Sequence, residues 1–263
     1  MLIDILSDKW KKAGLKNGDT VLLHSNCVRT VKYALQKGYV VDPNSLLDSF
    51  LKVLGSSGTL LLPLFNFDFT TGVPFDLRNT PSHMGVLTEA GRLHPLAVRT
   101  GHPIYSFAAI GYRAEEFRNV NNFSGYGIDS PFGILREMDG KIAVLDLPDQ
   151  NSMTFYHHIE EMNCVNYRYH KTFSGEYTDI SGKTELRTYG LFVRKLEEGV
   201  ITYLQSAENL MWQNELYEGF KPNEGCGLRI TSACRMFDFI SDIIHSGNAR
   251  GTLYRIEGVD DTQ

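Results

Sequence analysis

Short apolar runs separated by amphipathic segments fill the first 165 residues, and this alternation limits the possible folds more than any other feature of the chain. Each run has the length of a strand that is buried on both faces, and several of the intervening segments repeat apolar residues with the period of a helix. The apolar runs lie at residues 21–25, 58–65, 105–112 and 141–147. The predicted helices lie at residues 2–13, 43–54 and 84–93. We therefore predict an α/β fold in which a central mixed β-sheet is flanked by helices on both faces.

The sequence changes character after residue 170. Polar and apolar residues alternate through TFSGEYTDISGKTELRTYGLFVRK (172–195), which predicts antiparallel strands joined by a hairpin around residues 181–183. A helix is predicted at 203–218, and the pattern of residues 225–247 indicates a strand or turn that leads into an amphipathic helix. The C-terminal third is thus expected to add a smaller antiparallel β-containing lobe.

Composition excludes several classes of protein. The 263 residues carry a net charge of −5 and show no basic stripe, so we expect no nucleic acid as a partner. The four cysteines form no C-x-x-C pair, which is typical of free buried thiols in a reducing compartment. The N-terminal segment lacks the apolar core of a signal peptide, and no apolar run reaches the roughly 20 residues of a membrane span. We expect a soluble cytoplasmic protein that has no membrane partner.

Two histidines and two glutamates stand almost together in MTFYHHIEEM (153–162). The polar residues 149–152 before it favour a helix start, and on a helix His157 shares a face with Glu160 or Glu161. A carboxylate one turn after a histidine can hold one ring nitrogen, raise the basicity of the imidazole and leave the other nitrogen to accept a proton. The same residues also fit an exposed helix face with His–Glu pairs, or a metal site. These residues alone leave all three hypotheses open.

Six segments in sequence order resemble the aminoglycoside 3-N-acetyltransferase family, also called the antibiotic acetyltransferase family. The segments are GDTVLLHSN (18–26), GTLLLPLFNF (58–67), TPSHMGVLTEAGR (80–92), RTGHPIYSFAAIG (99–111), YGIDSPFG (126–133) and TFYHHIEE (154–161). The resemblance implies an enzyme that moves an acyl group from coenzyme A to a primary amine on a sugar-like acceptor, by direct attack in a ternary complex. Acetyl-CoA or another short acyl-CoA would be the co-substrate, and no metal is implied.

The family motif T-x-x-H-x-x-E falls on Thr154, His157 and Glu160, which the resemblance marks as catalytic. His157 would be the general base and Glu160 its orienting partner. Thr154 would donate to the oxyanion of the tetrahedral intermediate or contact the thioester sulfur, unless it only caps the helix. The second histidine and the second glutamate, His158 and Glu161, are then expected to be helix-face residues.

The first loop, HSNCVRTVK (24–32), resembles the family segment that lines the pantetheine arm, with Asn26 where the family has its second serine. Arg29 and Lys32 follow within reach of a phosphate, although solvated charge is the alternative. Ser106, in the segment RTGHPIYS (99–106), is the second predicted pantetheine contact. The predicted coenzyme-binding residues are therefore His24, Ser25, Asn26, Arg29, Lys32 and Ser106.

The acceptor is the least constrained part of the prediction. Asn66 and Asp68 follow a predicted strand, and Tyr167 and Arg168 lie in the basic, aromatic segment after the catalytic helix, so these four are predicted to bind the acceptor. Polycationic aminoglycosides should need a carboxylate-lined site, whereas residues 203–220 carry only scattered glutamates. We therefore expect a nucleotide-linked amino sugar, with an aminoglycoside as the alternative and a metal-dependent hydrolase as a remote one.

Together these features predict a single acyltransferase domain. Its predicted parts are a coenzyme-binding and catalytic core (1–165), an acceptor-side lobe (166–224), and a C-terminal helix and tail (225–263). The expected partners are a small amino-sugar acceptor and an acyl-CoA, and a homodimer is a possible assembly.

Overall fold

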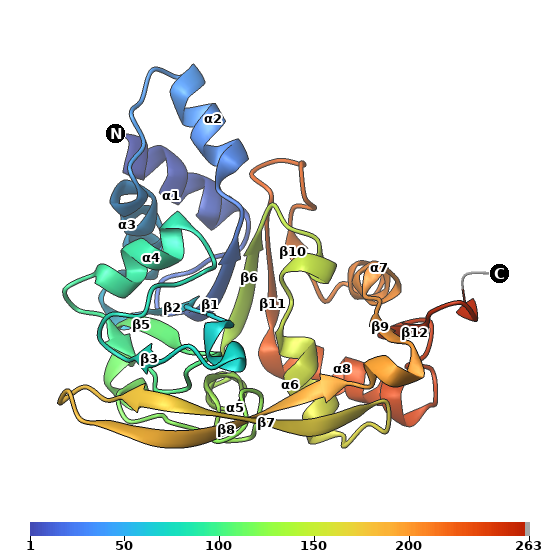
Figure 1. Cartoon of the computed structure of the whole chain (residues 1–263). Coiled ribbons are helices and arrows are strands. Elements are labelled where there is room, and N and C mark those ends of the chain that lie inside the picture. The colour runs from blue at the N-terminus through green and yellow to red at the C-terminus, as the bar shows by residue number, and fades with distance from the viewer. Residues whose placement is uncertain (261–263) are drawn as a thin grey trace.

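The computed structural model describes residues 1–260 of the chain, and its main element is a seven-stranded mixed sheet (Figure 1). The strand order is β10-β11-β6-β1-β2-β5-β4. The three central strands, β6, β1 and β2, are parallel, and the strands outside them pair in antiparallel fashion. The strand bounds are β1 Thr20–Ser25, β2 Thr59–Pro63, β4 Val98–Arg99, β5 Phe107–Gly111, β6 Lys141–Leu145, β10 Glu218–Gly219 and β11 Leu228–Ser232.

Helices cover both faces of this sheet, as predicted (Figure 1). One face carries α1 (Leu2–Lys12), α3 (Pro43–Leu54) and α4 (Val86–Leu93). The other carries α5 (Pro131–Glu137), α6 (Phe155–Met162) and α8 (Ala233–His245). The remaining α-helices in residues 1–260 are α2 (Val28–Gln36), which projects beyond the end of β1, and α7 (Gln205–Gln213). Short 3-10 helices occupy Gly55–Ser57 (η1), Asp68–Thr71 (η2), Ala114–Phe117 (η3), Asp149–Asn151 (η4) and Leu196–Glu198 (η5).

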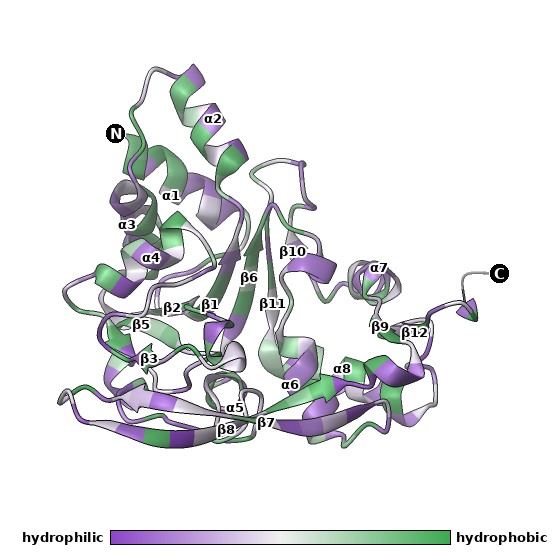
Figure 2. Ribbon diagram, viewed as in Figure 1, coloured by the Kyte–Doolittle hydropathy of each residue, from purple (hydrophilic) through white to green (hydrophobic). Residues whose placement is uncertain are grey.

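The apolar runs of the central strands are continuous because each strand is buried on both faces. On β1, Leu22 pairs with Leu61 and Ile142 and faces one hydrophobic cluster, whereas Val21 and Leu23 face the other. Successive side chains of a strand point to opposite faces, so an uninterrupted run of apolar residues fills two cores at once. Figure 2 shows these strands as the most hydrophobic part of the ribbon.

A long hairpin forms the predicted antiparallel lobe. Strands β7 (Arg168–Thr178) and β8 (Thr184–Arg194) pair along their whole length, with Gly182 in the connecting turn at φ +90°. The hairpin crosses beneath the main sheet in Figure 1, and β3 (Phe75–Asp76) joins it to make a three-stranded sheet. A further pair, β9 (Val200–Thr202) and β12 (Tyr254–Ile256), lies beyond it.

Two details differ from the sequence-based predictions, and one prediction falls outside the described residues. The helix predicted at 203–218 ends at Gln213, because the chain then turns into β10 at the sheet edge. Cys164, expected to be a buried thiol, is exposed directly after α6. The predicted tail ends in residues 261–263, which lie outside the described residues.

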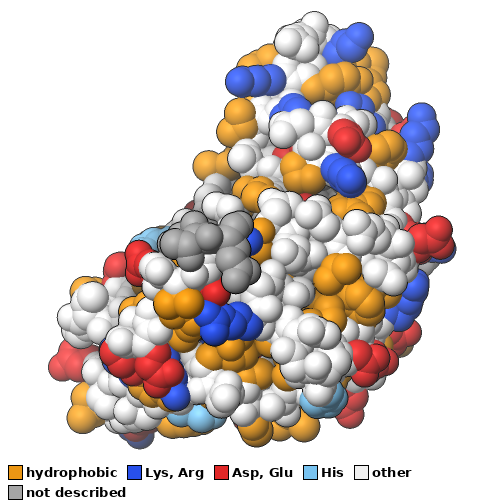
Figure 3. All heavy atoms as spheres, turned by 90° about the vertical axis from the view of Figure 1, so that its right-hand side faces the viewer, with side chains coloured by type: hydrophobic (Ala, Val, Ile, Leu, Met, Phe, Trp, Pro, Cys, Tyr) orange, Lys and Arg blue, Asp and Glu red, His pale blue; other side chains and the backbone are white. Residues whose placement is uncertain are grey.

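No helix within residues 1–260 has the length and apolarity needed to span a bilayer. On the face that carries α7 and β12, acidic and basic side chains are interspersed with apolar ones (Figure 3).

Candidate active site

His157 and Glu160 form a close pair on the first turns of α6. Nδ1 of His157 lies 2.8 Å from Oε2 of Glu160, and the two side chains are 20% and 2% exposed. Their i,i+3 spacing places both on one helix face, as predicted. Thr154 occupies the N-cap position of α6 but makes no side-chain capping hydrogen bond, so the capping role considered for it is not formed.

A third side chain, which the sequence did not connect with this pair, completes the cluster. Arg168, at the start of β7, places Nε 2.7 Å from Oε2 of Glu160 and Nη2 2.9 Å from Nδ1 of His157. Its Nη1 donates to the carbonyl of Phe192 at 3.0 Å. The arginine was predicted to bind the acceptor, but its guanidinium is buried and already shared by the His–Glu pair and the backbone.

Glu160 acts to raise the pKa of His157, as predicted, but the net shift of the pKa is downward. Burial, followed by the charge of Arg168, lowers the pKa of His157 below its usual value, and this outweighs Glu160. Burial alone would raise the pKa of Glu160, but Arg168 and His157 hold it below its usual value. At neutral pH the pair is therefore a neutral imidazole beside an ionised carboxylate, in which His157 can accept a proton.

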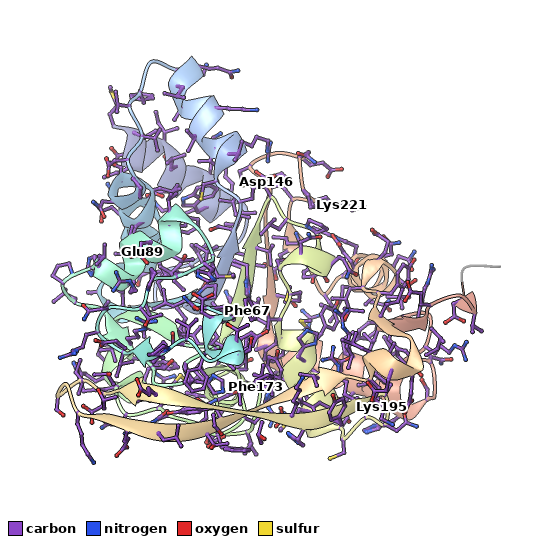
Figure 4. The ribbon with its side chains drawn as sticks, in the orientation of Figure 1. Phe67, Glu89, Asp146, Phe173, Lys195 and Lys221 are labelled. Atoms are coloured by element: carbon purple, nitrogen blue, oxygen red, sulfur yellow. The ribbon has the colours of Figure 1, made fainter. Side chains whose placement is uncertain are left out.

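The imidazole opens into a cavity of about 380 Å³. Its wall is aromatic and basic, and among the described residues that line it there is no aspartate or glutamate. The lining residues are Phe67, Tyr105, Tyr126, Gln150, His157, Arg168, Leu191, Phe192, Val193, Arg194 and Thr202. Figure 4 places Phe67 between the main sheet and the β7–β8 hairpin, and this hairpin supplies Arg168, Leu191, Phe192, Val193 and Arg194 to the wall of the cavity.

His158 and Glu161 are both buried, so the prediction that they lie on an exposed helix face was wrong. Nδ1 of His158 donates to the carbonyl of Tyr126 at 2.8 Å, and Oε2 of Glu161 accepts from the hydroxyl of Ser124 at 2.7 Å. Both residues thus hold the loop that carries Tyr126, whose ring centroid lies 5.3 Å from that of His157. Within residues 1–260, no group of three or more His, Cys, Asp or Glu side chains is arranged to hold a metal ion.

A second cleft, of about 680 Å³, lies at the carboxyl end of β1 and brings together four of the six predicted coenzyme-binding residues. These four are His24, Ser25, Asn26 and Lys32. The opposite wall comes from the start of α4 and the residues before it. The cleft is further lined by Cys27, Val28, Val31, Pro63, His83, Met84, Gly85, Val86, Leu87, Thr88, Leu147 and Asn151.

Arg29 and Ser106 do not line this cleft. The guanidinium of Arg29 is held by Asp146, with Nε 2.9 Å from Oδ2, and by the carbonyls of Glu224 and Gly225. Ser106 is fully buried, and its hydroxyl accepts hydrogen bonds from Arg99 at 3.2 and 3.3 Å.

Of the four residues predicted to bind the acceptor, Arg168 lines the His157 cavity, whereas Asn66, Asp68 and Tyr167 do not. The amide of Asn66 donates to the carbonyl of Pro81 at 3.0 Å, and Asp68 places Oδ2 3.4 Å from Nε2 of His83. Tyr167 is buried against the ring of Tyr254, with the centroids 3.9 Å apart.

His83 is a cleft residue that the sequence analysis missed, although it stands inside the quoted segment TPSHMGVLTEAGR.

The 3-10 helix η4 lies between the two cavities, since Gln150 lines the His157 cavity and Asn151 lines the cleft. Its first residue, Asp149, is fully buried and accepts from Tyr156, Tyr217 and Arg229 at 2.8, 2.7 and 2.6 Å. No sequence spacing indicated this cluster, because its members come from four separate segments. It fixes the wall that separates the cavities.

These features define a class: a mixed α/β protein in which a His–Glu pair faces one cavity and a larger cleft lies on the other side of a short helical wall. Comparison with known sequences then gives the family. The chain belongs to the aminoglycoside 3-N-acetyltransferase family, whose model matches residues 36–217.

Relatives of established name are distant and match only in part. Aminoglycoside N(3)-acetyltransferase VII of Streptomyces paromomycinus is 31% identical over 170 residues, which are 57% of this chain and 56% of that protein. Aminoglycoside N(3)-acetyltransferase IX of Micromonospora chalcea is 27% identical over 184 residues, 61% of this chain and 62% of the relative. The chain thus matches less than two thirds of the length of these curated relatives.

Solved structures share the whole fold. The aminoglycoside acetyltransferase AAC(3)-Xa superposes with a TM-score of 0.76 at 24% identity, covering 93% of this chain and 92% of that one. A structure described as AAC-IIIb in binary complex with CoASH superposes with a TM-score of 0.75 at 21% identity, covering 93% and 96%. These likenesses confirm the predicted mixed sheet with helices on both faces.

Proposed function

We propose that this chain is an acyl-CoA-dependent N-acyltransferase that acylates a primary amine of an amino-sugar acceptor. The observation that carries the proposal is the 2.8 Å contact between His157 and Glu160 at one cavity, with a cleft of about 680 Å³ on the other side of η4. This geometry can place a proton acceptor beside an amine while a thioester approaches from the cleft.

In the proposed reaction, Nε2 of His157 accepts a proton from the amine as the amine nitrogen bonds to the thioester carbon. The carbonyl oxygen gains the negative charge, and Thr154 is our candidate donor to it. Collapse of this intermediate re-forms the carbonyl and breaks the carbon–sulfur bond. The departing thiolate then takes the proton from His157, so that the products are an amide, coenzyme A thiol and a neutral imidazole.

The cleft is the proposed site of the acyl-CoA. His24, Ser25 and Asn26 lie at the carboxyl end of β1, where α/β sheets commonly bind ligands, and Lys32 brings a cation to the same wall. The description of AAC-IIIb as bound to CoASH supports this assignment. Arg29 and Ser106 would act on the coenzyme only indirectly, because their polar atoms are engaged by Asp146 and Arg99.

The comparisons favour an aminoglycoside as the acceptor over the nucleotide-linked amino sugar expected from the sequence. The curated relatives are named as aminoglycoside N(3)-acetyltransferases, and no sugar nucleotide occurs in the quoted names. We therefore propose acetylation of an aminoglycoside amine as the leading function.

One observation keeps the nucleotide-linked amino sugar as a second candidate. The His157 cavity is lined by Arg194, which is exposed, while the described residues supply no lining carboxylate. A polycation loses favourable charge complementarity at such a wall, whereas a phosphate gains it.

A thiol-release assay with acetyl-CoA tests the proposal. Aminoglycosides and UDP- or dTDP-linked amino sugars are compared at equal concentration, with the His157→Ala variant as the control for non-enzymatic release. We expect thiol release with an aminoglycoside. Faster turnover of a nucleotide-linked amino sugar, lost in Arg194→Glu, would transfer the assignment to the second candidate, and no release with any amine would refute the proposal.

A further inference from the structure

A buried cation stands directly behind the proposed general base. The side chain of Arg168 is 5% exposed, and its guanidinium contacts both members of the pair: Nε lies 2.7 Å from Oε2 of Glu160 and Nη2 lies 2.9 Å from Nδ1 of His157. It comes from β7, outside the T-x-x-H-x-x-E motif on α6.

Nδ1 of His157 cannot satisfy both neighbours at once. It can donate to Glu160, which leaves the lone pair of Nε2 free for a proton, or it can accept from Arg168, which places the proton on Nε2. Arg168 has two other partners, the carboxylate of Glu160 in an ion pair and the carbonyl of Phe192 in a hydrogen bond, whereas the carboxylate is the stronger attraction for the Nδ1 proton. The pair therefore favours the tautomer in which His157 can act as a base, with a fixed positive charge beside it.

Charges around the imidazole come from three elements. Glu160 on α6 is the anion, Arg168 on β7 is the near cation, and Arg194 at the end of β8 is a second, weaker cation. The phenols of Tyr105 and Tyr126 also line the cavity, and both stay neutral because burial raises their pKa. A protonated His157, which is 20% exposed, would thus face two cations and one carboxylate, which disfavours the charged ring.

We propose that Arg168 is a positioning residue that keeps His157 neutral and available as a proton acceptor in mildly acidic solution. The inference rests on the proposed function for its catalytic consequence. While the amine attacks, His157 carries the proton only transiently, and the cation behind it favours return of that proton to the departing thiolate. Arg168 therefore opposes the charge of Glu160 without disturbing its hold on Nδ1.

The test is the titration of His157 itself. NMR of histidine-labelled protein is compared for the unaltered chain, Arg168→Met and Arg168→Lys, with His157→Ala to assign the signal. Arg187→Met is a matched control, since Arg187 is a hairpin arginine that pairs with Glu185 and lines neither cavity. We expect the midpoint to rise by about 1 pH unit in Arg168→Met, to change little in Arg168→Lys and to stay unchanged in Arg187→Met.

Removal of Arg168 leaves the buried Glu160 without its cation, so Arg168→Met is at risk of misfolding. A second comparison removes the buried carboxylate of Glu160 from both proteins. It compares the titration midpoint of His157 in Glu160→Gln with that in Glu160→Gln/Arg168→Met. The midpoint should be higher in the double variant. An unmoved midpoint in a folded Arg168→Met or double variant would overturn the inference.

Activity gives an independent readout that a purely structural role would not move. The acid limb of kcat/KM against pH should shift upward in Arg168→Met, with about a tenfold loss of rate on its acid side, and Arg168→Lys should restore it. If the unaltered chain releases no thiol with any amine, the proposed function fails while the titration still tests Arg168. If it turns over and the limb of Arg168→Met stays in place, the inference alone fails.

Discussion

Arg229 on β11 donates from Nη2 to Oδ1 of Asp149 on η4 at 2.6 Å, and both side chains are fully buried. Asp149 also accepts from Tyr156, the residue before His157, so the ion pair ties β11 of the main sheet to the start of α6. A buried ion pair adds little net stability to a folded protein, because both charges lose their hydration. Removing one partner is strongly destabilising, because the other charge is then buried without compensation.

We therefore predict that Arg229→Met lowers the free energy of unfolding by about 3–5 kcal/mol, measured by urea denaturation. Arg229→Met/Asp149→Asn should recover part of the loss, because the buried Asp149 carboxylate is removed together with its cation, although Glu208 stays nearby. Equal stability of Arg229→Met and the unaltered chain would contradict the importance assigned to this pair.

His157→Ala should abolish acyl transfer while leaving coenzyme binding largely intact. The imidazole lines the His157 cavity rather than the cleft, so its removal takes away the proton acceptor without changing the coenzyme wall. Turnover is measured by thiol release and coenzyme binding by calorimetry. Turnover like that of the unaltered chain would refute the assignment of the base.

Glu160→Gln should lower kcat/KM by about a hundredfold. The amide can still accept from Nδ1 of His157, but it brings no charge, and the imidazole would then face Arg168 without an opposing anion. The pH profile of kcat/KM is the more specific measurement, because its acid limb should move to lower pH in this variant. A shift in the opposite direction would show that Glu160 does not stabilise the protonated ring.

Lys32→Glu should raise KM for acetyl-CoA by roughly tenfold, with a smaller change in kcat, because it replaces a cation on the wall of the cleft by an anion. Lys37→Glu is the matched control, since Lys37 follows the same helix, α2, and lines neither cavity. Identical KM values for the two variants would argue against coenzyme phosphates beside Lys32.

Three buried histidines predict how stability depends on pH. Burial lowers the pKa of His24 to about 3 and the pKa values of His102 and His158 to about 4. Below the unfolded value of 6.5 the unfolded chain binds protons that the folded chain refuses, so stability is fully present above 6.5 and is lost as the pH falls. The free energy of unfolding should fall by about 4 kcal/mol per pH unit around pH 5, measured by urea denaturation. A stability that is constant between pH 7 and pH 5 would contradict the neutral, buried state of these rings.

The strands and helices of the main sheet were predictable because their signal is local. Apolar runs such as 58–65 and 141–147 are buried on both faces, so composition alone marks them as strands. Helices α2 and α5 were missed. Residues 28–36 form the amphipathic helix α2, but its first half was assigned to a loop because it resembles the family segment that lines the pantetheine arm. In α5, seven residues are too few to show a period.

The motif T-x-x-H-x-x-E gave the pair His157 and Glu160, because i,i+3 spacing on one helix fixes their contact. Sequence could not show that His158 and Glu161 are buried or which loop they hold, since their partners lie more than 30 residues away. The sequence also could not show that a cation lies beside His157, because Arg168 is brought to the pair by the direction of β7.

The sequence by itself determined the apolar strands of the sheet centre, the family resemblance and the pairing of His157 with Glu160, because each of these signals is carried by short segments of the chain. Only the tertiary structure decided the surroundings of that pair: the arginine behind it, the carboxylate-free wall in front of it and the Asp149 cluster beside it. The physical reason is that desolvation and charge act through space, between side chains that β-strand pairing and helix packing bring together from distant segments.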